Sequence, residues 1–155
     1  MAVTSLNTIL AAVRTYRRLK KRIVTTNGVF DLIHVGHVMN LTKAKALGDV
    51  LIVGINSDAS VRKNKGKGRP IVPERERAQI VAAFKVVDHV FIFNEPTVHS
   101  WIAKIKPDIH VKGSDRTLSQ VLERGVVQKN GGRVVLIPHT RLHTTTALLK
   151  KIHRL

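Results

Sequence analysis

The chain has 155 residues, a length typical of one domain and sufficient to bury a core without covalent cross-links. It contains no cysteine, which excludes a disulfide scaffold, a thiolate zinc site and a cysteine nucleophile. Its longest apolar runs fall far short of the ~18 residues that a membrane span needs. The 27 lysines and arginines outnumber the 10 acidic residues, and the formal charge of +17 favours anionic partners such as nucleic acid, anionic lipid or phosphorylated small molecules.

The first 22 residues form a basic, amphipathic segment. Leu6, Ile9, Leu10 and Val13 recur at helical spacing, so a helix is predicted over about residues 5–20. Six basic side chains and no acidic side chain accompany them. A mitochondrial transit peptide has the same composition, but we favour a leading helix that packs on the domain.

Beyond this segment, short apolar runs alternate with helical patterns. The second run reads Val-Leu-Ile-Val-Gly-Ile, continuously apolar as in strands buried on both faces of a parallel sheet. Alternating strands and helices predict an α/β fold with a doubly wound, five-stranded parallel sheet. We interpret residues 1–155 as one domain, with a leading helix in 1–22 and a core in 23–152. The predicted strands are Ile23–Thr26, Val50–Asn56, Val90–Phe93, Asp108–Val111 and Arg133–Ile137, and the predicted helices are 37–47, 74–87, 97–105, 118–129 and 144–153.

The loop after the first predicted strand carries the most specific motif, because residues 26–37 read TNGVFDLIHVGH. Ligands of a doubly wound sheet bind beyond the carboxyl ends of its strands. Gly28 permits close approach of a ligand to the backbone. His34 and His37 are three residues apart at a helix start, where free N–H groups favour anions. A His-x-x-His pair alone more often indicates a metal pair or structural histidines, but the full segment indicates a phosphate site.

This segment resembles the signature of the nucleotidyltransferase superfamily with a His-x-Gly-His motif, in its cytidylyltransferase-like branch, which has a Rossmann-like fold. Four further segments resemble the D-glycero-β-D-manno-heptose 1-phosphate adenylyltransferases of ADP-heptose and lipopolysaccharide synthesis, and the resemblance extends over about residues 23–152. These enzymes occur alone or fused to a kinase, and without a kinase domain this chain resembles the stand-alone form. The segments are 53–61 (VGINSDASV), 65–66 (KG), 69–70 (RP) and 111–115 (VKGSD).

The resemblance implies which side chains bind each substrate. His34, His37 and Lys65 are expected to be catalytic, and no residue is assigned as a metal ligand. Asp31, Arg77 and Lys112 are assigned to the acceptor. The nucleotide is assigned to Asn27, Gly28, Val29, Phe30, His34, His37, Lys65, Gly113, Asp115, Thr144, Thr145 and Thr146.

Simpler interpretations of several positions stay open. Residues 62–70, predicted to form a mobile loop, also suit a solvated charge run. Gly113–Asp115 suits a turn, and Thr144–Thr146 suits a helix N-cap. Arg77 suits an exposed helical arginine. His89, His99, His110 and His153 are interpreted as packing or surface residues, whereas His139 and His143 are expected near the phosphate end.

The expected reaction transfers AMP from ATP to a sugar 1-phosphate and releases pyrophosphate, with Mg²⁺ bound alongside ATP. The alternatives are a cytidylyltransferase for glycerol 3-phosphate or a similar alcohol phosphate and, more remotely, a nucleic-acid-binding module, although no such motif is present. Residues 116–119, after Asp115, depart from the family's usual aromatic and acidic residues, which leaves the sugar open. We expect a cytoplasmic enzyme that binds ATP and a phosphorylated sugar, without specific nucleic-acid binding or a membrane span; homo-oligomerisation is left open.

Overall fold

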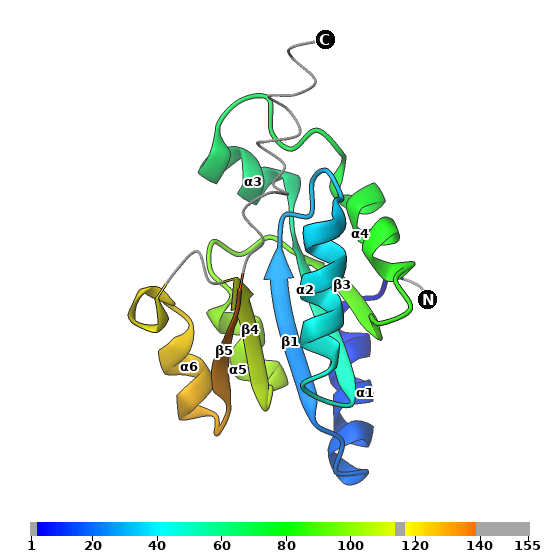
Figure 1. Cartoon of the computed structure of the whole chain (residues 1–155), viewed down its shortest axis with the longest axis vertical. Coiled ribbons are helices and arrows are strands. Elements are labelled where there is room, and N and C mark those ends of the chain that lie inside the picture. Colours follow the sequence, from blue (N-terminus) through cyan, green and yellow to red (C-terminus); the bar gives the residue numbers. More distant parts are fainter. Residues whose placement is uncertain (1–2, 114–116, 139–155) are drawn as a thin grey trace.

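The computed structural model describes residues 3–113 and 117–138. Five parallel strands form one sheet in the order β3-β2-β1-β4-β5 (Figure 1). The chain runs outward from β1 in both directions, first through β2 and β3 and then through β4 and β5, which confirms the doubly wound prediction. The strands are β1 (Ile23–Gly28), β2 (Val50–Asn56), β3 (His89–Phe93), β4 (Ile109–Gly113) and β5 (Arg133–Ile137).

Helices cover both faces of the sheet (Figure 1). On one face, α2 and α4 pack through residues such as Leu41 and Val81 against the strands. On the other, α1, α5 and α6 pack around Ile9, Trp101 and Val127. Because β2 lies under both layers, its first six residues are buried. The helices are α1 (Leu6–Arg18), α2 (Val35–Lys45), α3 (Asp58–Lys65), α4 (Glu74–Ala82), α5 (His99–Ile105) and α6 (Arg124–Lys129), with a 3₁₀ turn over Leu118–Gln120.

The leading helix α1 packs on the domain, as favoured from its composition. The Ser5 side chain caps it by accepting a hydrogen bond of 3.1 Å from the Thr8 N–H. Ile9 and Val13 are buried against the sheet. The Tyr16 hydroxyl lies 2.8 Å from His89 Nε2, which ties the helix to the start of β3.

Besides shifts of one or two residues at the ends of elements, the structure differs from the predicted segments in three places. Helix α3 was missed: the Ser57 side chain caps it, Asp58 lies in its first turn, and the basic residues in its last turn suit the helix dipole. The helix predicted over 74–87 ends at Ala82, because the chain then turns to enter β3. The helix predicted over 118–129 is broken before α6, where Val121 is extended and buried. The predicted helix 144–153 lies outside the described residues.

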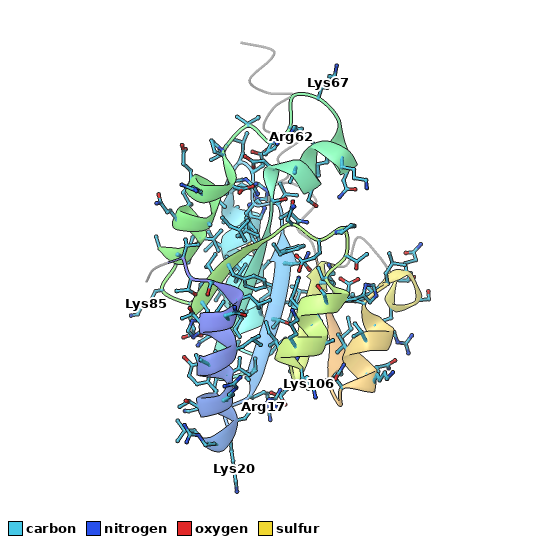
Figure 2. All side chains as sticks on the ribbon, turned by 180° about the vertical axis from the view of Figure 1, so that it is seen from behind. Arg17, Lys20, Arg62, Lys67, Lys85 and Lys106 are labelled. Atoms are coloured by element: carbon cyan, nitrogen blue, oxygen red, sulfur yellow. The ribbon has the colours of Figure 1, made fainter. Side chains whose placement is uncertain are left out.

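Basic side chains are distributed over the molecule. Figure 2 shows Arg17, Lys20 and Lys106 at one end and Arg62 and Lys67 at the opposite end. These basic side chains therefore lie at both ends of the molecule. Within the described ranges, no helix has the length and apolar character needed to cross a bilayer.

Candidate active site

Two hollows open at the carboxyl ends of β1 and β4, one on each face of the sheet. The first, a cavity of about 160 Å³, lies on the α2 face and is lined by residues 26–30 and 111–113 with His37. The second has a volume of about 510 Å³ and lies between α3 and the starts of α5 and α6. Asn27 and Lys112 line both hollows and form the boundary between them. This is the position at which the chain path diverges from β1, where doubly wound proteins bind ligands.

His34 and His37 meet at the N-terminus of α2. His34 is the N-cap residue, and the two imidazole rings stack with centroids 3.9 Å apart. The His34 N–H donates a hydrogen bond of 3.3 Å to Nδ1 of His37. Since Nδ1 of His37 accepts this bond, a neutral His37 carries its proton on Nε2. The residue itself lines the first cavity.

The first loop forms a compact wall beside these histidines. Phe30 has a left-handed backbone with φ of 51° and is buried, and its ring lies 5.2 Å from the ring of His37. A Cβ at Gly28 would lie 3.0 Å from the Phe30 ring. Glycine at this position therefore lets the loop close and leaves the adjacent backbone open to a ligand.

Lys112 connects the end of β4 to both β1 and α6. Its ammonium donates a hydrogen bond of 2.8 Å to Oδ1 of Asn27 and lies 2.5 Å from Oε1 of Glu123. Only 21% of the Lys112 side chain is exposed, whereas Lys65, at the end of α3, is exposed at the second hollow. Lys65 and Lys112 bring two positive charges to the second hollow and Glu123 brings one negative charge, so the net charge of these three side chains is positive and suits an anionic ligand.

Asp31 is part of the protein framework. It is buried, and its carboxylate accepts hydrogen bonds from the N–H groups of Ile71 and Val72 and from the Arg69 guanidinium at 2.8 Å. Burial acts to raise the pKa of Asp31, but these hydrogen bonds and the Arg69 charge outweigh it and lower the pKa below its usual value. The carboxylate therefore fixes residues 69–72 against the first loop.

Arg77 is also buried, with no exposed surface, so the interpretation as an exposed helical arginine is wrong. Its Nε donates to the Val72 carbonyl at 2.8 Å, and its terminal nitrogens donate to the carbonyls of Val29 and Asn56. The guanidinium also pairs with Asp58 at 2.6 Å. This network holds the first loop, the end of β2 and the start of α3 together.

The structure brings most of the predicted site residues to this region. Asn27, Gly28, Val29, Phe30, His37, Lys112 and Gly113 line the first cavity, and His34 stacks on His37. Lys65 lies at the second hollow, on the last turn of α3 rather than on the mobile loop predicted for residues 62–70. Neither hollow is lined by Asp31 or Arg77. Asp115, Thr144, Thr145 and Thr146 lie outside the described residues.

Sequence reasoning missed many of the residues that line the hollows, and four of them show why. Asn40 and Leu41 of α2 and Ile137 of β5 line the first cavity, and Glu123 lines the second. The periodicity of α2 places Asn40 one turn after His37, which is a usable signal. Glu123 had no comparable signal, because its contact with Lys112 depends on how α6 packs.

The pattern of the cytidylyltransferase-like family matches residues 25–147. The chain belongs to this family. It is 45% identical over 150 residues to the bifunctional protein HldE of Citrifermentans bemidjiense and 51% identical over 134 residues to that of Geobacter metallireducens. These alignments cover 97% and 86% of this chain but 31% and 27% of the relatives, so the chain spans about a third of their length.

Solved structures agree with this membership of the cytidylyltransferase-like family. The lipopolysaccharide core biosynthesis protein from Thermoplasma volcanium superimposes with a TM-score of 0.65 at 32% identity, covering 77% of this chain and 97% of that one. The pantoate-beta-alanine ligase from Francisella tularensis has a TM-score of 0.64 at 18% identity, covering 100% of this chain and 78% of that one. The latter similarity concerns the fold alone.

Proposed function

We propose that this chain is an adenylyltransferase that joins AMP from ATP to a sugar 1-phosphate, with heptose 1-phosphate as the preferred acceptor. One observation carries the proposal: the stacked His34–His37 pair at the start of α2, beside a cavity that Asn27 and Lys112 separate from a second, basic hollow. The identity of 43–51% to HldE proteins and the segment 111–115 support the heptose acceptor and ATP.

In this proposal each hollow takes one substrate. The nucleotide occupies the cavity between the first loop, α2 and the end of β4, and the sugar phosphate occupies the hollow that contains Lys65 and Lys112. This revises the expected role of Lys65 from the triphosphate toward the acceptor. It also makes Asp31 and Arg77 framework residues that hold the loop instead of acceptor ligands.

The reaction needs little proton transfer. A phosphate oxygen of the acceptor is anionic at neutral pH and attacks the α-phosphorus of ATP. The bond from the α-phosphorus to the bridging oxygen of the β-phosphate breaks, and pyrophosphate leaves with that electron pair. His37, and His34 stacked on it, donate hydrogen bonds to the α-phosphate oxygens as charge shifts. The positive end of the helix dipole at the start of α2 adds to this stabilisation.

The residues near the hollows fit a magnesium ion that enters with ATP. The two buried carboxylates of this region, Asp31 and Glu123, already pair with Arg69 and Lys112. In the described part of the chain, no group of three or more acidic or histidine side chains stands together to hold a metal. The triphosphate and water would therefore supply most of its ligands, and the ion would neutralise charge on the leaving group.

A substrate panel tests this function. The purified chain is incubated with Mg²⁺, ATP or CTP, and either heptose 1-phosphate, hexose 1-phosphates or glycerol 3-phosphate, and pyrophosphate is measured. We expect release with ATP and heptose 1-phosphate and its near loss in His37→Ala. A preference for CTP with glycerol 3-phosphate would establish the alternative cytidylyltransferase.

A further inference from the structure

A line of polar side chains crosses the sheet on the face covered by α5 and α6. Residues two apart on a strand face the same side, so Thr25 shares a side with Asn27 on β1, as His110 does with Lys112 on β4. The sheet register pairs Thr25 with His110. The ring of Trp101, from α5, lies 5.9 Å from the His110 ring and identifies this side. Because the surrounding core is apolar, these polar groups need partners.

The line ends at the boundary between the two hollows. The Thr25 hydroxyl lies 2.8 Å from His110 Nδ1, and His110 Nε2 lies 3.5 Å from Glu123 Oε1. The same Glu123 oxygen lies 2.5 Å from the Lys112 ammonium, which donates a hydrogen bond to Asn27. A continuous chain of contacts therefore connects a buried histidine with the asparagine that lines both hollows.

The charges along this line are determined by its surroundings. Burial, the largest effect, lowers the pKa of His110, so this ring is neutral at neutral pH. Burial by itself would raise the pKa of Glu123, but the adjacent His110 ring and the charge of Lys112 outweigh it and hold that pKa well below its usual range. Glu123 is thus an anion, with a neutral histidine on one side and an ammonium on the other.

We infer that Glu123, backed by His110, is a positioning residue that holds the Lys112 ammonium at the boundary of the two hollows. Lysine can only donate hydrogen bonds, so the Asn27 atom that faces Lys112 is the amide oxygen. The Asn27 NH₂ group is therefore left to donate to a substrate. Glu123 and His110 act on the reaction through Lys112. The inference rests on the proposed adenylyl transfer.

The substitution Glu123→Gln separates this role from two simpler ones. If Glu123 acted only through its charge, its removal would strengthen binding of an anionic acceptor by the basic hollow. If it acted only in packing, stability would fall while the constants for both substrates stayed the same. Positioning predicts weaker use of the acceptor, because small displacements of an orienting group are costly for catalysis.

We expect Glu123→Gln to lower kcat/KM for the sugar phosphate by about 10–100-fold and to change the KM for ATP by less than about threefold. The control is Glu76→Gln, which makes the same charge change at an exposed position of α4. A double-mutant cycle with Lys112→Met tests the route of action. If Glu123 acts through Lys112, the double variant is no worse than Lys112→Met alone.

Urea unfolding of each variant accompanies the kinetics. Should Glu123→Gln fail to fold, Glu123→Asp carries the same test, because it keeps the anion but shortens the arm that reaches Lys112. An unchanged or increased kcat/KM for the sugar phosphate, or fully additive effects in the cycle, overturns the positioning role while the proposed function stands. Absence of turnover in the wild-type chain with every sugar phosphate overturns both.

Discussion

Replacing Arg77 with lysine tests how much the protein relies on the geometry of one buried guanidinium. The native side chain has no exposed surface and donates to the carbonyls of Val29, Asn56 and Val72 and to the Asp58 carboxylate. A lysine ammonium is a single point and cannot span acceptors arranged around a planar fork. We expect it to retain about two of these contacts. Each buried acceptor left without a donor costs about 1–2 kcal/mol, which gives a loss of about 2–4 kcal/mol.

Urea unfolding measures this loss, with the slope of the free energy against urea as a check that the unfolded state is unchanged. Arg75→Lys is the matched control, because Arg75 is exposed on the same helix. Arg77 contacts Val29, which lines the first cavity, and Asn56, which lines the second, so Arg77→Lys is also expected to raise the KM for both substrates. A variant within about 0.5 kcal/mol of wild type would refute the framework role.

Three further predictions concern catalysis and stability. His34→Ala and His37→Ala should each lower kcat by about 10²–10³-fold with a smaller effect on the KM for ATP; near wild-type turnover in both folded variants contradicts their assignment. Gly132→Ala should lower the unfolding free energy in urea by more than about 2 kcal/mol, because a Cβ would overlap the Pro107 carbonyl oxygen. Gly125→Ala, which has open space around it in α6, should raise the unfolding free energy by up to about 1 kcal/mol. Equal effects of the two substitutions contradict this account. The unfolding free energy should also fall between about pH 7.5 and about pH 5.5, because burial lowers the pKa of His89 and His110 in the folded protein, so the unfolded chain binds more protons below about pH 6.5. Each neutral histidine contributes its full stabilisation above about pH 6.5, and this contribution is lost as the pH falls toward the pKa of the folded state. The loss amounts to at most about 1.4 kcal/mol per pH unit for each histidine. An unfolding free energy that rises on acidification contradicts this prediction.

The fold was predictable where its signal is local and repeated. The strands Val50–Asn56 and Arg133–Ile137 match their predicted bounds. Both are dense apolar runs, and such runs are typical of strands with helices on both faces of the sheet. Helix α3 was not found, because most of its residues are polar and its basic last turn has the composition of a loop. Its signal is the cap at Ser57, which is a better guide here than apolar periodicity.

The candidate site likewise contains residues that a local pattern predicts and residues that only tertiary packing brings together. The His34–His37 pair was predictable, since a spacing of three residues at a helix start places both rings together irrespective of the rest of the fold. The burial of Arg77 depends on three segments that meet only in the folded chain. The contact between Lys112 and Glu123 depends on the start of α6. No local sequence pattern predicts the burial of Arg77 or the contact between Lys112 and Glu123, because both result from tertiary packing.

Following the phosphorus atoms of ATP tests adenylyl transfer most directly. The chain is given Mg²⁺, heptose 1-phosphate and ATP labelled with ³²P at either the α- or the γ-position, with His37→Ala as the control, and the products are separated. The account predicts that α-label enters a nucleotide-sugar product and that γ-label appears only in pyrophosphate, at rates that fall together in the control. Label from the γ-position in the sugar, or the absence of any α-labelled sugar conjugate, would contradict it.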